Sequence, residues 1–291
     1  MRLSLPLSPA PFTWNAALAL ARAAKLTYAD PATVVQTAEQ DWQCDKCVFL
    51  EYEDSQGFAC ACGNAALVAF RGTESAADWI ANLRMYRTRQ AYGGVHTGFF
   101  VAYRNIREQL LAALADARIG AARPLWLTGH SLGGALATIA AAELHGHANI
   151  AGVATFGQPR VGDEDFHAFM DARFAGRFWR FVHGSDLVTR LPPGLEHVGT
   201  LHHLTTGEVT SVLMPSTGKM PVAPTAPTAE APPLSLDELE QLQHQLSELR
   251  VASLAAPPDA MAEGLLPGVR DHAIDGYIAA IEQAAQADLP I

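Results

Sequence analysis

A serine framed by glycines is the residue of this sequence best placed to do chemistry. Residues 129–133 read Gly-His-Ser-Leu-Gly, between the apolar run Leu125–Thr128 and the alanine-rich run Gly134–Leu144. The pattern G-x-S-x-G between a strand and a helix is typical of a nucleophilic serine on a sharp turn, which tolerates no side chain close by. The helix that follows would direct its free N–H groups and its positive dipole end at the reacting centre. The spacing therefore predicts that Ser131 is a catalytic nucleophile.

A serine hydroxyl needs a base, and the base needs an acid that orients it. After a serine turn of this kind, the acid and the base follow the serine in chain order. Asp186 comes soon after the apolar run Phe178–Val182, so its carboxylate is expected on the same rim of the sheet as Ser131. Asp163 and Asp165 follow the preceding apolar run and compete for this role. We expect these two carboxylates in a solvated loop or at a helix N-terminus instead.

The best-placed base on chain order is His272, which stands just before the last predicted helix. His197 follows the acid too closely for the chain to turn back between acid and serine. His244 falls inside a helix that comes after a proline-rich linker. For the histidines other than the predicted base we expect hydrogen-bonded structural roles: His197, His202, His203 and His244.

Apolar runs alternate with amphipathic ones, and this pattern predicts an α/β fold. Strands that alternate with helices imply a mostly parallel sheet with helices on both faces. The predicted strands are Val48–Tyr52, Gly57–Cys62, Ala65–Phe70, Leu125–Thr128, Gly152–Phe156 and Phe178–Val182. The predicted helices are Thr13–Tyr28, Gly98–Ala117, Gly134–Leu144 and Ile274–Ala285, with a further helix beginning at Ser235.

An insertion of about 211–265 separates the predicted acid from the predicted base. Residues 215–233 form a Pro/Ala/Thr-rich linker, and Ser235 and Glu238 then make a capping box. The helix that follows carries a single apolar stripe, which is expected to cover the protein body, a second copy or the mouth of the site. Ordinary core packing is the favoured alternative, and the insertion could be a pocket wall, a second lid or an appendage. The stripe consists of Leu239, Leu242, Leu246 and Leu249.

Composition limits the class of protein. The chain has 291 residues, 49% hydrophobic and 17% charged, which excludes wholesale disorder and a coiled coil and predicts one large domain over 1–291. Its 20 basic and 30 acidic residues give a net charge of −10, without a basic cluster, so no nucleic acid partner is expected. No apolar stretch of about 18 residues predicts a transmembrane segment. Prolines interrupt any signal-like apolar stretch at the start, so a cytoplasmic protein, or one exported without an evident signal peptide, is expected.

Four cysteines lie close together in the sequence, at positions 44, 47, 60 and 62. The spacing Cys44-x-x-Cys47 invites a zinc interpretation, and a zinc-based interaction protein is one alternative class. Cys60 and Cys62 lie in an alternating run, however, and would share one face of a strand. Buried core thiols are therefore the favoured expectation, with no metal, while a metal site or a disulfide remains as an alternative.

The sequence resembles the class 3, or fungal-type, triacylglycerol lipases of the α/β-hydrolase superfamily. The similar segments arrive in the family's order over about residues 65–277. They are Val68–Thr73 with Asp78–Leu83, Val95–Phe99, Gly129–Ala135, Thr155–Asp163, Asp186–Pro193, and Asp271-His272 followed by Tyr277.

The resemblance implies an α/β-hydrolase fold, with Ser131 as nucleophile, Asp186 as acid and His272 as base. It also implies an oxyanion hole made by Thr73 and by the backbone N–H of Leu132. No cofactor is implied. The implied substrate is a lipid or other apolar acyl ester, with transient contact at a lipid–water interface and an oligomeric state left open. Phospholipase A1 or feruloyl-type esterase activity is the alternative, and a non-catalytic binding module on the same scaffold is a third.

The segment after the oxyanion residue acts as a lid in such lipases. Here it carries an apolar patch of Trp79, Ile80 and Leu83 on one helical face. The patch indicates either a surface helix seated on the core or a cover over Ser131 that turns toward lipid. Helical periodicity alone does not separate these two alternatives.

Overall fold

The computed structural model describes most of the chain. The described residues are 3, 5–9, 11–116, 118–120, 123–205, 208–212, 231–253, 267–287 and 291. Most of the linker predicted at 215–233, and the end of the predicted insertion after 253, lie outside the described residues. None of the described helices combines the length and the apolar character needed to cross a bilayer.

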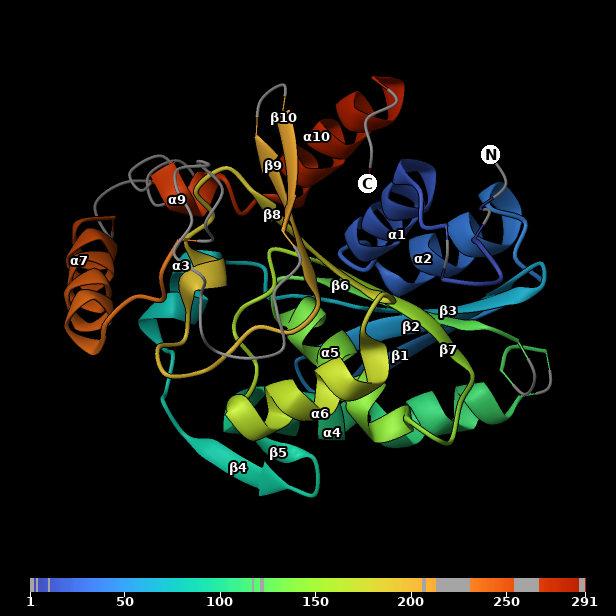
Figure 1. Cartoon of the computed structure of the whole chain (residues 1–291), viewed down its shortest axis with the longest axis horizontal. Helices are drawn as coiled ribbons and strands as arrows, with labels where there is room; N and C mark the ends of the chain where they lie inside the picture. The colour runs from blue at the N-terminus through green and yellow to red at the C-terminus, as the bar shows by residue number, and fades with distance from the viewer. Residues whose placement is uncertain are drawn as a thin grey trace.

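A mixed eight-stranded sheet forms the centre of the molecule, in the order β1-β2-β3-β6-β7-β8-β9-β10 (Figure 1). The five strands from β3 to β9 are parallel, whereas β1, β2 and β10 pair antiparallel with their neighbours. The strands are β1 Lys46–Tyr52, β2 Ser55–Cys62, β3 Ala65–Phe70, β6 Leu125–His130, β7 Ile150–Phe156, β8 Phe178–His183, β9 Thr200–Thr205 and β10 Glu208–Val212. The carboxyl ends of the parallel strands therefore meet at one rim.

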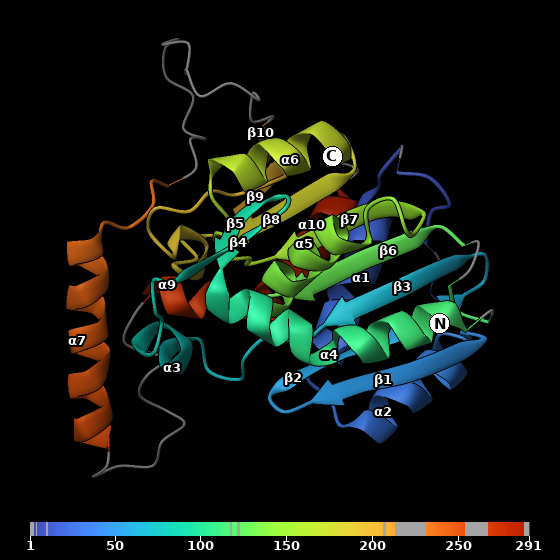
Figure 2. The ribbon, with the colours of Figure 1, turned by 90° about the horizontal axis from the view of Figure 1, so that it is seen from below.

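Helices cover both faces of this sheet, as the alternating pattern predicts (Figures 1 and 2). Helices α1 (Trp14–Leu26) and α10 (Ile274–Gln286) pack together on one face. Helices α4 (Thr97–Ala115), α5 (Leu132–Leu144) and α6 (Glu164–Phe174) lie on the other. Helix α5 is buried along nearly its whole length, and its small alanines let it lie close against β6 and β7.

The remaining described elements are short or peripheral. They are α2 (Pro31–Gln36), a π-helical turn (Thr37–Asp41), α3 (Ala76–Ala81), the hairpin β4 (Arg87–Gln90) and β5 (Gly93–His96), a 3-10 turn (Val188–Arg190), α7 (Leu236–Ser253) and α9 (Pro267–Arg270). The sequence analysis did not predict α2, α6, β4, β5, β9 or β10. The strands β4 and β9 carry many polar or charged side chains, so the apolar runs that reveal the central strands are missing from them.

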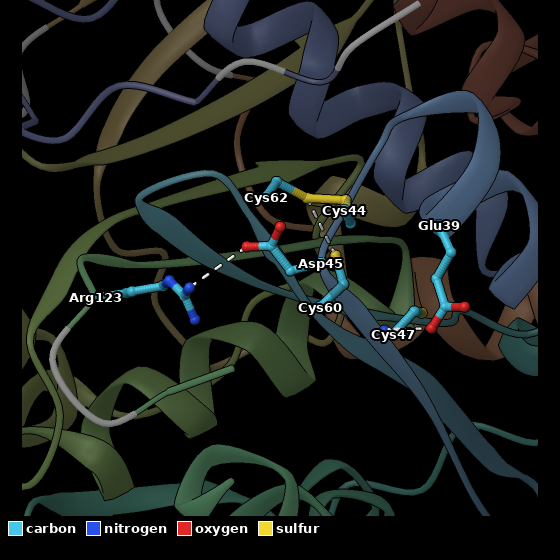
Figure 3. Close-up of a disulfide and its surroundings, with 7 residues drawn as sticks. All are labelled: Glu39, Cys44, Asp45, Cys47, Cys60, Cys62 and Arg123. Carbon is cyan, nitrogen blue, oxygen red and sulfur yellow. Dashed lines mark hydrogen bonds and ion pairs between the residues drawn. A yellow bond between two sulfur atoms is a disulfide. The ribbon is translucent and has the colours of Figure 1, made fainter. Parts of the chain in front are cut away.

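The cysteine expectation is partly wrong. Cys44 and Cys62 form a disulfide with an S–S distance of 2.19 Å, while Cys47 and Cys60 are buried thiols (Figure 3). Cys60 and Cys62 do share one strand face, and their sulfur atoms lie 3.5 Å apart. Spacing alone could not reveal the pairing, because the turn that brings Cys44 beside the end of β2 depends on the packing of α2. Burial, with Glu39 nearby, raises the pKa of Cys47 to about 12, so this thiol stays protonated.

Candidate active site

Ser131 occupies a sharp turn between β6 and α5. Its backbone has φ 57° and ψ −130°, a left-handed conformation that a non-glycine residue rarely adopts. Its N–H donates to the carbonyl of Phe156 at 2.9 Å, and this bond fixes the turn to the neighbouring strand. A side chain at Gly129 would collide with the backbone of Gly133, and one at Gly133 would collide with Phe70. The turn thus requires the two glycines of the sequence pattern.

Asp186 and His272 form a buried hydrogen-bonded pair. Nδ1–H of His272 donates to Oδ2 of Asp186 at 2.8 Å, and less than 5% of either residue is exposed. The backbone N–H of Val188 donates to the other carboxylate oxygen at 2.9 Å. The carboxylate follows β8, and the imidazole stands between α9 and α10. The other ring nitrogen of the imidazole, Nε2, is buried without a hydrogen-bond partner.

The serine turn and the buried pair lie at the same rim of the sheet. The ring of His130, the residue before the serine, is 4.6 Å from the ring of His272 between centroids. At Gly157, a Cβ atom would lie 2.9 Å from both the Asp186 carboxylate and the His272 ring. This glycine follows β7, the strand between β6 and β8, and Gly157 has φ 59°. The ends of β6 and β8 therefore carry Ser131 and Asp186, and the turn between α9 and α10 brings His272 beside them.

The predicted oxyanion residues border a cavity of about 930 Å³. Thr73, just after β3, has a hydroxyl that is buried without a hydrogen-bond partner. Leu132 is the first residue of α5, where backbone N–H groups have no partner within the helix. Both residues line the cavity together with Gly72. Two sets of donors thus face one space beside Ser131.

The lid segment forms the opposite wall of this cavity. Trp79 and Leu83 line it, and Trp79 stacks on Phe99 with ring centroids 6.1 Å apart. Ile80, the third predicted lid residue, is fully buried and faces α7. The apolar face of α3 is therefore divided between the cavity and a second helix.

Helix α7 covers α3, at the left-hand edge of Figures 1 and 2. Its leucine stripe, as predicted from the sequence, packs into one apolar cluster with α3. Gln243 of α7 donates from Nε2 to the carbonyls of Ile80 at 2.9 Å and Leu83 at 3.2 Å. The stripe residues in the cluster are Leu239, Leu242 and Leu246, and the side chain of Leu249 lies outside the described part.

The start of α7 is anchored beside the predicted acid. Ser235 and Glu238 form the predicted capping box, with both reciprocal hydrogen bonds present. Arg190 donates from Nε to the carbonyl of Pro232 at 2.9 Å, and the N–H of Leu234 donates to the carbonyl of Arg190. The turn that follows Asp186 thus holds the chain entering the helix.

The competing acids and histidines have structural partners. Asp163 caps the N-terminus of α6, and Asp165 pairs with Arg89 at 2.7 Å, in agreement with the sequence analysis. His197 and His203 each hydrogen-bond to a backbone carbonyl, at 2.6 and 2.7 Å. Burial lowers the pKa of His197 well below its usual range, so this imidazole stays neutral.

Two contributors to the site were not singled out from the sequence. Gln243 follows no pattern that would distinguish it from the other polar residues of α7. Tyr28 follows α1, far from the motifs, and its hydroxyl lies 2.8 Å from Nδ1 of His130. Only the packing of α1 against β6 places the tyrosine there, so no local signal could have revealed it.

Residues 67–196 match the family model of the lipases of class 3. This segment is therefore similar to the class 3 lipases over a little less than half of the chain. The matched segment contains Thr73, Ser131 and Asp186, whereas Tyr28, α7 and His272 lie outside it.

Two named proteins are similar in sequence to part of this chain. The chain is 38% identical over 133 residues to the secreted mono- and diacylglycerol lipase 1 of Fusarium solani, covering 44% of this chain and 39% of that one. It is 28% identical over 149 residues to a chloroplastic phospholipase A1 of Arabidopsis thaliana, covering 43% of this chain and 33% of that one. The chain thus spans about two fifths or less of the length of these two relatives.

The fold is similar to that of a solved triacylglyceride lipase. The structure of the Rhizomucor miehei triacylglyceride lipase superposes with a TM-score of 0.54 at 25% identity, covering 64% of this chain and 77% of that one. This similarity, with the mostly parallel sheet, assigns the α/β-hydrolase fold that the sequence resemblance implies.

Proposed function

We propose that this protein is a serine carboxylic ester hydrolase that cleaves apolar acyl esters. Within that class we propose a lipase that acts on acylglycerols. The observation that carries the proposal is the buried hydrogen bond between Asp186 and His272 beside a serine on a left-handed turn. The class 3 lipase segment and the acylglycerol lipases among the relatives support it.

In this proposal Ser131 is the nucleophile and His272 the base. Nε2 of His272 takes the hydroxyl proton while Oγ of Ser131 attacks the ester carbonyl, and a tetrahedral oxyanion forms. The C–O bond to the alcohol then breaks, and the imidazolium gives its proton to the leaving alcohol. Water attacks the acyl-enzyme next, its proton passes to His272, and the acid leaves as the serine regains its proton.

Asp186 orients the base in this scheme. Because its carboxylate accepts the proton on Nδ1, the neutral imidazole presents Nε2 with a free lone pair. That nitrogen is buried without a partner, which suits a proton acceptor kept apart from water. The carboxylate also stabilises the imidazolium that forms during attack.

Thr73 and Leu132 form the oxyanion hole in this proposal. Donors directed at a developing oxyanion each contribute about 3–4 kcal/mol of transition-state stabilisation. The N–H of Leu132 comes from the start of α5, where the helix dipole adds to the effect. The unpaired hydroxyl of Thr73 is available as a further donor.

Helices α3 and α7 together form a closed lid in this proposal, with one α/β-hydrolase domain over 1–291 and residues 211–265 as its insertion. Opening would expose the leucine stripe of α7 and the apolar side chains of α3. These surfaces suit transient contact with a lipid–water interface, since the charge of −10 gives no attraction to anionic membranes. Activity is then expected to rise steeply when a short-chain ester passes its solubility limit. A smooth saturation curve through that limit would count against the lid.

Phospholipase A1 activity is a second candidate, favoured by the similarity to the Arabidopsis enzyme of that name. We also propose export from the reducing cytoplasm. The disulfide between Cys44 and Cys62 suits an oxidising compartment, and the Fusarium relative is named as secreted.

Phosphonate titration tests the proposal directly. We expect a p-nitrophenyl alkylphosphonate to label one serine per chain, with the added mass on the peptide that contains Ser131. A Ser131→Ala variant with unchanged thermal unfolding is the control and should take up no label. Stoichiometric failure to label the wild-type protein would refute the proposed reaction. A panel of p-nitrophenyl esters beside triolein and phosphatidylcholine then separates the two candidate activities.

A further inference from the structure

A chain of hydrogen bonds and close contacts runs behind the site and joins three loops. The hydroxyl of Tyr28 lies 2.8 Å from Nδ1 of His130, and Nε2 of His130 lies 2.7 Å from the backbone carbonyl of His272. Gly72 packs against the tyrosine oxygen and leaves no room there for a side chain. The three loops carry the oxyanion residue, the serine and the base of the proposed reaction.

The chemistry of the groups fixes the direction of every bond in this chain. A carbonyl only accepts, so His130 must carry its proton on Nε2 and donate it to His272. Its Nδ1 is then an acceptor, and the tyrosine O–H must donate to it. Each proton in the chain has a single assignment.

Burial keeps this assignment in place. Burial lowers the pKa of His130 well below its usual range, and His272 nearby lowers it further. Burial also raises the pKa of Tyr28 well above its usual value. The imidazole thus remains neutral and the phenol remains protonated at physiological pH.

The loop of Gly72 and the loop of His130 are in close contact with Tyr28. A side chain at Gly72 would collide with the Tyr28 hydroxyl and with the carbonyl of His130, so the oxyanion loop lies in direct contact with both. The guanidinium of Arg71 lies 5.5 Å from the centre of the Tyr28 ring. Residues 72 and 130 immediately precede Thr73 and Ser131, so a shift in either contact moves a proposed reacting group.

We propose that Tyr28 and His130 are positioning residues, which set the distance between the oxyanion donors and the base. The inference rests on the proposed function, because it assigns a role relative to that reaction. Neither residue lines the 930 Å³ cavity, so neither is placed to contact an ester bound there. Without the Tyr28 hydroxyl, Nδ1 of His130 is buried without a hydrogen-bond partner. The ring of His130 then shifts, and the carbonyl of His272, which accepts from its Nε2, shifts with it.

Tyr28→Phe is the test, with Tyr92→Phe as the matched control. Tyr92 donates a 2.7 Å hydrogen bond to Glu143 on the helical face formed by α4, α5 and α6, outside the site. We expect Tyr28→Phe to lower kcat about 10- to 100-fold, as for a small misplacement of reacting groups, with KM within about twofold. Tyr92→Phe should keep both constants. Equal kcat in the two variants, or a loss confined to KM, would overturn the inference.

A double-mutant cycle checks the chain itself. His130→Gln combined with Tyr28→Phe should lose no more activity than His130→Gln alone, because the first substitution already breaks the chain. Fully additive losses would show two independent effects and contradict the proposal. Wild-type labelling by the phosphonate keeps the two proposals separable: a labelled wild type with an unaffected Tyr28→Phe variant overturns only the positioning role.

The ¹⁵N spectrum of histidine-labelled wild-type protein provides a readout that needs no variant to fold. We expect His130 to be neutral with its proton on Nε2 across pH 6–8. A proton on Nδ1, or on both nitrogens, would overturn the assigned chain.

Discussion

Asp186 accepts three hydrogen bonds, one from its own turn and two from the segment that begins α10. His272 and the phenol of Tyr277 share Oδ2, at 2.8 and 2.5 Å, while the N–H of Val188 occupies Oδ1. Burial raises the pKa of Tyr277 well above its usual value, and the neighbouring carboxylate raises it further, so the phenol is a permanent donor. The carboxylate is thus held by groups that leave it a single orientation toward the imidazole.

The backbone beside this pair has no room for a side chain. We expect Gly157→Ala to abolish most esterase activity, about 100-fold or more, because the new Cβ would lie 2.9 Å from both Asp186 and His272. Gly176→Ala is the matched control, since Gly176 also has a positive φ, 73°, but no atom within 4 Å of the added Cβ. Each substitution should lower the free energy of unfolding by about 1–2 kcal/mol in urea titrations. Equal activity in the two variants would contradict the contact with the pair.

The sequence predicts those residues of the site whose roles follow from local patterns or chain order. It does not predict those that only tertiary packing places there. The turn at Ser131 is predictable because its conformation demands glycines at fixed offsets. Asp186 is predictable because it follows the end of a strand, and His272 is predictable from chain order. Tyr28 and Gln243 are not, since their partners are backbone or ring atoms of segments more than 100 residues away.

Among the elements, α3 and α7 behave as one unit. The side-chain amide of Gln243 donates to the carbonyl of Ile80 in α3 and to that of Leu83, just after the helix. A hydrogen bond of this kind contributes about 1 kcal/mol, so it shifts the closed-to-open ratio of a lid about fivefold.

Gln243→Ala should therefore favour opening. We expect the rate on a short-chain ester below its solubility limit to rise about fivefold, and the ratio of rates above and below the limit to fall accordingly. Gln245→Ala, an exposed glutamine on the same helix, is the control and should keep the wild-type ratio. Identical ratios for the two variants would show that the amide does not hold the lid closed.

The sequence predicts the central elements and misses those at the edges. Strands β3, β6, β7 and β8 are buried on both faces, so they read as continuous apolar runs. Strand β4 has no buried position and β9 has no regular alternation of buried and exposed positions, so neither shows an apolar run. The α7 stripe is visible as a pattern, but the surface it covers is decided only by the fold.

Across the whole molecule, the disulfide lies at the amino ends of the parallel strands and the proposed active site at their carboxyl ends. Cys62 pairs with the first residue of β3, whereas Ser131 follows the carboxyl end of the parallel strand β6. Linking cysteines 18 residues apart stabilises a fold by about 3 kcal/mol in the chain-entropy description.

The double variant Cys44→Ser/Cys62→Ser should lose about that much unfolding free energy while keeping kcat in the folded protein. Urea unfolding and ester hydrolysis at low temperature measure the two quantities. A dithiol should destabilise the wild type and leave the double variant unchanged. A kcat loss in the folded double variant would show that the far end of the sheet acts on the site.

Buried neutral histidines make the stability of the whole molecule depend on pH. Burial lowers the pKa of His130 and His197 well below the usual range, and burial with Arg180 nearby lowers that of His202 to about 4. In the unfolded chain these groups bind protons near pH 6.5. Below that pH the unfolded state holds more protons than the folded state, so stability falls as the pH decreases.

The window from pH 6.5 to pH 5 isolates this effect, because most carboxylates are still ionised there. The unfolding constant should rise toward tenfold per pH unit for each buried histidine, and His202 should contribute until about pH 4, where its folded state also takes up the proton. Urea titrations across this window measure the slope. His202→Gln should reduce the slope of unfolding free energy against pH by the contribution of one proton. His244→Gln, at an exposed position on α7, should leave this slope unchanged. A slope that stays the same in His202→Gln would mean that His202 takes up its proton equally in the folded and unfolded states, contrary to its burial against Arg180.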